Sequence, residues 1–142
     1  MKNLDLKEAA FTMQDNDRFY AIISSSPIKY EQEPDAETIL TFFVVRRASG
    51  LIDFYNVMKT FKGANCISRN VQSKLNIPEA KIATEMEAIK TQFTKGIQAA
   101  TNFTIDWNHL DLSGIEDRDE QVRRIQQWNR LNVYKFPDFS LN

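Results

Sequence analysis

Glycine is scarce in this chain of 142 residues, which has only four where average usage would give about ten. The four stand alone at positions 50, 63, 96 and 114. A loop that cradles phosphate needs glycine because the backbone must approach the anion closely. The sequence therefore contains neither a standard P-loop nor a standard dinucleotide-binding fingerprint.

Cysteine and histidine are scarcer still, with one of each, Cys66 and His109. A single cysteine cannot form an intramolecular disulfide, which fits a reducing compartment, and it excludes a cysteine-based zinc site. The longest apolar run is FFVV, far short of the roughly 18 residues that a membrane span requires. The opening MKNLDLKEAAF has acidic residues and no apolar core, unlike a secretory signal or a transit peptide. We therefore expect a cytoplasmic protein without membrane contact and without a cofactor.

Positive charge in bulk is also absent, because 18 Lys and Arg against 19 Asp and Glu give a formal net charge of -1. This balance argues against a protein that coats nucleic acid. The hydrophobic fraction of 42% and the charged fraction of 26% are typical of a globular protein. The length suffices for one hydrophobic core, so we expect a single α+β domain over residues 1–142.

Strands are predicted in the first half of the chain. Residues 9–14 and 18–24 are rich in β-forming side chains and flank a turn-forming Asp-Asn-Asp sequence, which predicts a hairpin. Residues 25–35 are expected to form a loop or a short edge strand. Residues 37–47 are apolar enough for burial on both faces, so this strand is expected to be central. Residues 51–58 favour a fourth strand, although their apolar positions also fit helical spacing.

Helices are predicted in the second half. Within residues 66–75, Ile67, Val71 and Leu75 recur every four positions, which favours a short helix. Residues 77–101 carry apolar side chains at alternating steps of three and four. That spacing predicts a long amphipathic helix.

The C-terminal third is expected to end in one more helix and a tail. Residues 102–107 are interpreted as a short strand or an extended connector. Ser113 and Glu116 stand in capping-box spacing, so the last helix is expected to begin near Ser113. Residues 133–142 contain a proline and several aromatic side chains, and are expected to form an extended aromatic tail.

Strands followed by helices, without regular alternation, indicate an α+β fold. We predict an antiparallel sheet of three to five strands from the N-terminal half, packed on one face by about three helices from the C-terminal half.

The clearest chemical candidate is the segment DWNHLD, with Asp106, His109 and Asp111. Imidazole and carboxylate groups bind divalent cations and perform acid/base catalysis. No second histidine exists to complete an ordinary zinc site. The segment is better explained as a polar loop that enters the last helix, whose N-terminus favours carboxylates.

Cys66 is a second candidate, because a thiol near Arg69 and near a helix start is activated as a nucleophile. Pairing with His109 is conceivable, since such partners can be distant in sequence. A small buried hydrophobe is the commoner role of a cysteine outside disulfides, so we assign no catalytic residue.

Charge is distributed unevenly along the chain. No acidic residue occurs between Asp53 and Glu79, or from residue 121 to 135, whereas residues 104–120 hold six acids and one arginine. If the two basic segments share a face, they form a surface for phosphate contact and base stacking. Its residues would be Lys59, Lys62, Arg69, Lys74, Arg123, Arg124 and Arg130. The same charges could instead solvate helix faces.

Protein association is the preferred functional hypothesis, because no catalytic group of residues rises above background. An extended apolar terminus needs a groove of its own chain or of a partner, which gives Trp128, Tyr134, Phe136 and Phe139 as partner-binding candidates. We expect a non-enzymatic accessory, adaptor or inhibitor protein that forms a homo-oligomer. One alternative is binding of single-stranded nucleic acid or a phosphorylated nucleotide by the basic residues. A second is a metal-dependent hydrolase that uses Asp106, His109 and Asp111.

Overall fold

The computed structural model describes residues 13–101 and 104–131, which form one sheet and two helices. Neither helix in these ranges is both long enough and apolar enough to cross a membrane. In chain order the elements are β1 (Arg18–Ser25), β2 (Ile28–Tyr30), β3 (Glu33–Arg46), β4 (Ile52–Lys62), β5 (Asn65–Ile77), α2 (Glu79–Thr101), β6 (Trp107–Asp111) and α3 (Arg118–Leu131).

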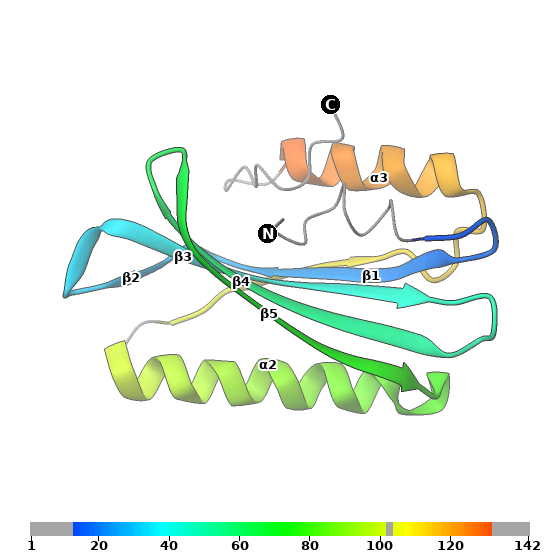
Figure 1. The fold of residues 1–142 in the computed structure, drawn as a ribbon, viewed down its shortest axis with the longest axis horizontal. Helices are drawn as coiled ribbons and strands as arrows, with labels where there is room; N and C mark the ends of the chain where they lie inside the picture. The colour runs from blue at the N-terminus through cyan, green and yellow to red at the C-terminus, as the bar shows by residue number, and fades with distance from the viewer. Residues whose placement is uncertain (1–12, 102–103, 132–142) are drawn as a thin grey trace.

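The sheet is antiparallel, and β3, β4 and β5 are its long strands (Figure 1). The strand order is β5-β4-β3-β1-β6, with the short β2 paired to β3 off this path. β6 comes after α2 in the chain and adds itself to β1. Among the described residues, β5 and β6 are therefore the two ends of the strand order.

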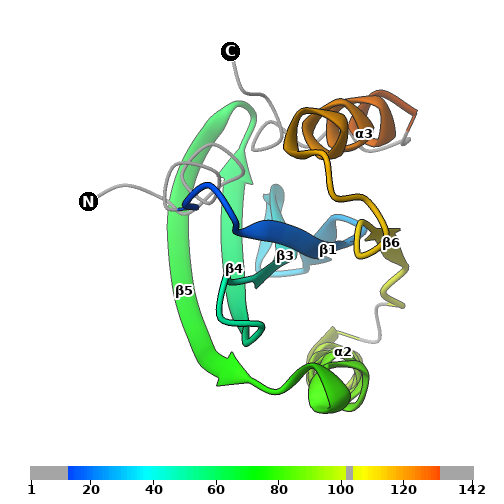
Figure 2. The same ribbon diagram turned by 90° about the vertical axis from the view of Figure 1, so that its right-hand side faces the viewer.

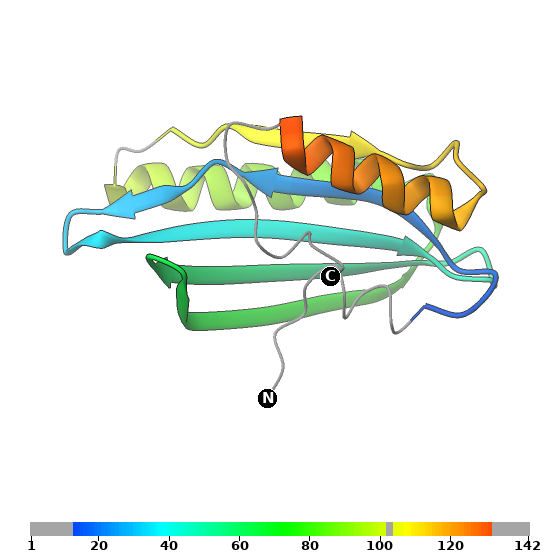
Figure 3. The same ribbon diagram turned by 90° about the horizontal axis from the view of Figure 1, so that it is seen from above.

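The helices lie on opposite faces of the sheet. Figure 1 shows α2 below the sheet and α3 above it, and Figure 2 shows the sheet curving between them. Figure 3 shows α3 over the β1 and β6 side, with β5 at the opposite edge. The α+β class and the antiparallel sheet are as expected, but the predicted packing of about three helices on one face is wrong. The described sheet has six strands, because one expected helix is β5 and a further strand, β6, lies in the C-terminal half.

The central position predicted for residues 37–47 is confirmed, since β3 pairs with β1 on one side and β4 on the other. Consecutive side chains of β3 enter different clusters. Phe42 and Val44 pack on the α2 side with Ile82 and Met86, whereas Phe43 and Val45 pack on the α3 side with Ile125. A strand buried on both faces needs such a continuous apolar run.

Two further strand predictions are confirmed. Residues 18–24 lie in β1, although residues 9–12 of the expected hairpin partner are outside the described residues. Residues 51–58 lie in β4 apart from Leu51. Gly50 has φ +89 in the turn that precedes β4, a conformation that glycine adopts without strain.

The helix predicted over residues 66–75 is wrong, because this segment is β5, antiparallel to β4. The spacing of Ile67, Val71 and Leu75 misled the prediction, since positions four apart share a face in a helix and also in a regular strand. The two-residue turn at Gly63 and Ala64 was the missed signal, because such a turn joins hairpin strands.

The long helix predicted over residues 77–101 is confirmed as α2, which begins after Pro78. The apolar side chains of α2 are buried to different extents along the helix. Ile82 and Met86 in the first half are buried, whereas Ile89, Phe93 and Ile97 are only partly buried. The N-terminal half of α2 is therefore the part that packs most closely on the sheet.

The prediction that DWNHLD is a loop entering the last helix is also wrong. Residues 107–111 form β6, and Ala21 through Ser25 of β1 pair with them. α3 begins at Arg118, where the Asp117 side chain accepts a 3.1 Å hydrogen bond from the Asp119 backbone N–H, as an N-cap does. The capping box expected at Ser113 and Glu116 is wrong. Ser113 bonds Asp111 instead, and Glu116 pairs with Arg46.

Candidate functional site

β5 is a long strand whose residues are mostly exposed to solvent. Of its thirteen residues only Ile77 is buried, and Arg69 and Val71 are half-buried. One edge of the strand pairs with β4, and no strand of the described residues pairs with the other edge. An open edge presents unpaired backbone N–H and C=O groups, which are a template for a strand from another chain.

The central part of β5 is regular and is bounded by two irregularities. Pairing with β4 runs without interruption from Ser68, opposite Thr60, to Lys74, opposite Phe54. The register shifts just outside both ends of this segment, which we call the regular segment of β5. Ile67 and Leu75 flank it and are 51% and 52% exposed. These are two of the three exposed large hydrophobic side chains among the described residues.

The two faces of the regular segment differ. Val71 packs at the border of the apolar cluster beneath α3, and its opposite residue on β4 is the buried Val57. Gln72 and Lys74 point to the other face, where they line a pocket beside α2. Residues on this strand alternate between the faces as in any strand, so Arg69, Val71 and Ser73 share the α3 face.

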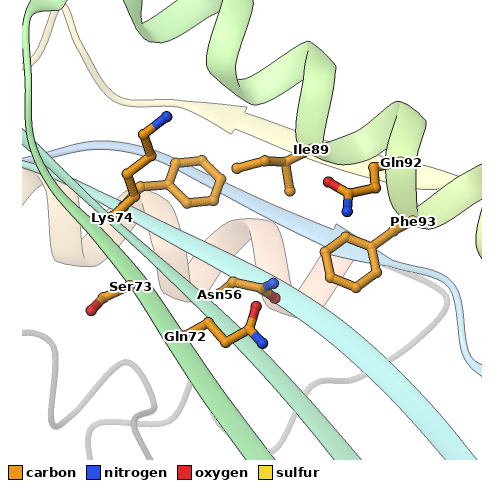
Figure 4. A pocket seen from close by; sticks show the side chains of 8 residues that line it. Asn56, Gln72, Ser73, Lys74, Ile89, Gln92 and Phe93 are labelled. Atoms are coloured by element: carbon orange, nitrogen blue, oxygen red, sulfur yellow. The ribbon is translucent and has the colours of Figure 1, made fainter.

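The pocket between β5 and α2 has a volume of about 220 Å³. In Figure 4 the side chains of Asn56, Gln72 and Lys74 reach it from the sheet, and Ile89, Gln92 and Phe93 reach it from the helix. The Oδ1 atom of Asn56 is buried and has no hydrogen-bond partner. An unpaired buried carbonyl is costly, so this pocket is a weak point of the packing beside β5.

The basic residues predicted to bind a ligand are divided between the two faces. Lys74 pairs with Glu85 of α2 at 2.8 Å, on the face opposite α3. Arg123 and Arg124 both pair with Glu120 on α3. Because α2 and α3 cover opposite faces (Figure 1), these cations do not form one surface.

Of the remaining basic candidates, two are neighbours on adjacent strands and two lie elsewhere. Lys59 is 3% exposed in β4 and lies directly opposite Arg69 of β5. Lys62 pairs with Glu33 at 3.4 Å near the β4–β5 turn. Arg130 is exposed in the last turn of α3. Ligand binding by these residues stays a prediction.

Trp128 is the one partner-binding candidate within the described residues. It is half-buried on α3 and packs against the cluster beneath that helix, so part of its surface serves the core. Tyr134, Phe136 and Phe139, with the expected tail 133–142, lie outside the described residues.

The residues of DWNHLD are positioned by strand β6. His109 and Asp111 are two apart on β6, and both are exposed. Asp106 precedes the strand, and its backbone exchanges hydrogen bonds with the backbone N–H and side chain of Ser26. Within residues 13–101 and 104–131, no group of three or more His, Cys, Asp or Glu side chains is placed to hold a metal ion.

The electrostatics of His109 do not favour a charged imidazole. Although His109 is exposed at the surface, neighbouring atoms remove part of the water around its imidazole, which lowers its pKa, and the positive charge of Lys90 on α2 lowers it further. Asp111 and Glu87 act in the opposite direction, and the net pKa lies below that of an ordinary histidine. Asp111 itself accepts hydrogen bonds from the Ser113 hydroxyl and backbone N–H, which lower its pKa.

A Cys66 and His109 pair is not formed. Cys66 is exposed on β5 and His109 is on β6, at opposite ends of the strand order. Cys66 is also at the start of a strand rather than of a helix. Of the two features proposed to activate it as a nucleophile, the helix start is therefore missing, whereas Arg69 lies three positions along the same strand.

Comparison with known proteins identifies no relative of this chain. No family model, curated protein or solved structure matches the chain. The site is therefore assigned from the residues of this chain alone, and the exposed edge of β5 is the candidate.

Proposed function

We propose that this chain is a small, non-enzymatic binding module of the cytoplasm that acts by protein association, in an accessory, adaptor or inhibitor role. The edge of β5 is its contact surface. The observation that carries this proposal is a strand of thirteen residues, exposed over most of its length, whose outer edge has no partner strand among the described residues.

Strand addition supplies the physical basis of this contact. An incoming strand forms main-chain hydrogen bonds that give affinity, and alternate side chains give specificity. Ile67 and Leu75 offer apolar contacts at the two ends of the regular segment. The half-buried Val71 offers one at its centre.

The cytoplasmic location is supported by the thiol of Cys66. This side chain is exposed on β5 and is the one cysteine of the sequence, so an intramolecular disulfide is impossible. An exposed thiol is kept reduced in the cytosol, whereas oxidising compartments favour disulfides.

The two alternative functions have no observation in their favour. Lys62, Lys74, Arg123 and Arg124 are in ion pairs with carboxylates of the same chain, and those carboxylates repel an approaching phosphate. The hydrolase alternative needs a metal, and His109 and Asp111 are joined by no third ligand among the described residues. Association through β5 is therefore preferred.

Site-specific photo-cross-linking tests this proposal. A photoreactive amino acid replaces Asn70 on β5 or, as a matched control, the exposed Glu87 on α2. Each protein is irradiated in an extract of the cells that produce it. We expect covalent adducts with protein from position 70 and few from position 87. Equal labelling from both positions, or no adduct from position 70, would contradict association through β5.

A further inference from the structure

We propose that the occupant of the β5 edge is a second copy of this chain. The two β5 strands pair antiparallel around a two-fold axis at Val71, which joins two sheets into one. This inference rests on the proposed function and adds the identity of the partner and the register of the contact.

The axis is placed by the regular segment of β5. This segment runs from Ser68 to Lys74, and Val71 is its midpoint. An antiparallel self-pair with full overlap of the segment therefore places Val71 opposite its own copy. Any other register leaves part of the regular segment unpaired and extends pairing into an irregular end.

The charges of β5 fit this register. Arg69 and Lys74 are the charged residues of the strand, and like charges directly opposite each other destabilise a strand pair. An axis at Val71 places Arg69 opposite Ser73 of the second copy and Lys74 opposite Ser68. An axis at Arg69 or at Lys74 would instead place a cation against itself.

The uncharged side chains are also matched. Asn70 lies opposite Gln72 of the second copy, so two amide pairs flank the central valines and can exchange hydrogen bonds. At each end of the segment Ile67 of one copy comes beside Leu75 of the other. Each copy thus covers Ile67 and Leu75 of the other, two large apolar side chains that are half exposed in the single chain.

A two-fold axis perpendicular to the sheet keeps corresponding faces together. Both α3 helices then lie on one face of the joined sheet and both α2 helices on the other. The contact is isologous, so it closes at two copies. Pairing also covers the two open β5 edges, which would otherwise be free to recruit other strands.

Cysteine cross-linking tests the register. In a Cys66→Ser background of the full chain, single cysteines replace Asn70, Val71, Gln72 or Ser73. Residues opposite each other have Cα atoms about 5 Å apart, within the range of a disulfide. The two copies of residue 73 would be roughly 13 Å apart. We expect an oxidant to produce disulfide-linked dimer from Val71→Cys and little from the other three.

Charge variants give a second test that does not depend on replacing Val71. In Ser73→Arg the new arginine of each copy lies opposite Arg69 of the other copy, so the dimer contains two such contacts between like charges. We expect the dissociation constant of the dimer, measured by sedimentation velocity, to rise about tenfold. Adding Arg69→Glu to this variant creates two Arg–Glu pairs and restores the dimer. The matched control is Thr91→Arg, which adds the same charge on exposed α2 and is expected to leave the dimer unchanged.

The outcomes separate this inference from the proposed function. A purified chain that stays monomeric, or whose strongest cross-link is at a residue other than 71, overturns the two-fold pairing. One different protein that cross-links at position 70 and not at the control position 87 in the extract would then leave association through β5 standing. A monomeric chain that also forms no adduct from position 70 would overturn both the two-fold pairing and association through β5.

Discussion

The side chain of Gln121 on α3 pairs with the backbone of Phe19 on β1 as a neighbouring strand would. Its Nε2 donates to the Phe19 carbonyl at 2.8 Å, and its Oε1 accepts from the Phe19 N–H at 2.9 Å. The same Nε2 also lies within 3.0 Å of the carbonyls of Leu112 and Ile115. Gln121 is fully buried, so it fixes α3 on the sheet where β6 has ended.

Gln121→Leu is expected to lower the free energy of unfolding by about 3 kcal/mol, because it leaves the Phe19 N–H and nearby carbonyls buried without this partner. Urea denaturation measures this loss. Gln127→Leu, on the exposed side of α3, is the control and should change stability by less than about 0.5 kcal/mol. Equal changes in the free energy of unfolding for both variants would show that the buried amide of Gln121 does not stabilise the fold more than an exposed one.

Arg47→Met is expected to destabilise the fold by about 3 kcal/mol. Arg47 pairs with Asp53 at 2.7 Å and Asp17 at 3.1 Å, and these carboxylates are 10% and 6% exposed. Removing the guanidinium leaves both carboxylates in poor contact with water. The neighbouring Arg46→Met breaks a pair with Glu116, which is 70% exposed, and should cost less than about 1 kcal/mol. Thermal and urea denaturation compare the two.

The pKa of His109 is expected to lie below that of an ordinary histidine in an NMR titration. Burial disfavours the imidazolium, and Lys90 repels it. A lowered pKa means that the contribution of His109 to stability is present above the unfolded pKa, about 6.5, and is lost as the pH falls. Lys90→Gln should raise the pKa of His109, whereas Lys95→Gln, farther along α2, should have a smaller effect. A pKa unchanged by Lys90→Gln contradicts this explanation.

Asn56→Val is expected to raise the free energy of unfolding by about 1 kcal/mol. The substitution removes a buried carbonyl oxygen that has no partner, and valine is favoured in strands. Asn70→Val replaces an exposed amide of the adjacent strand and is the control. A loss of stability in Asn56→Val would indicate that the amide is satisfied by water in the pocket.

The sequence predicts the buried strand and the long helix well. The run from Leu40 to Val45 can satisfy two apolar faces only at the centre of a sheet, and the apolar stripe of residues 77–101 fits one helix face. Both signals extend over enough residues to exclude other conformations. They define the middle layer and one covering helix.

Other parts could not be predicted, because their local signals fit two structures. The spacing of Ile67, Val71 and Leu75 suits a helix or a strand, and pairing with β4 decides between them. DWNHLD is polar enough for a loop, but the open side of β1 accepts it as a strand. Likewise the charge pattern does not show that Lys74 and Arg123 are on different faces, which depends on where α2 and α3 pack.

The candidate site itself depends on the corrected assignment of β5. The symmetric order of side chains around Val71 has no meaning in a helix, where positions 70 and 72 face different directions. Once the segment is a strand with one open edge, the same order predicts a self-complementary pair. The functional hypothesis of association therefore came from the sequence, but its location did not.

Hydrogen–deuterium exchange of the purified full chain over a dilution series tests association through β5 most directly. Amide groups on the open edge are protected only when another strand pairs with them. We predict that the amides of residues 68–74 whose N–H groups face the open edge, every second residue, are protected at high concentration and lose this protection on dilution, while β3 stays protected throughout. Exchange in residues 68–74 that is independent of concentration, with concentration-dependent protection in α3 or elsewhere, would contradict the account.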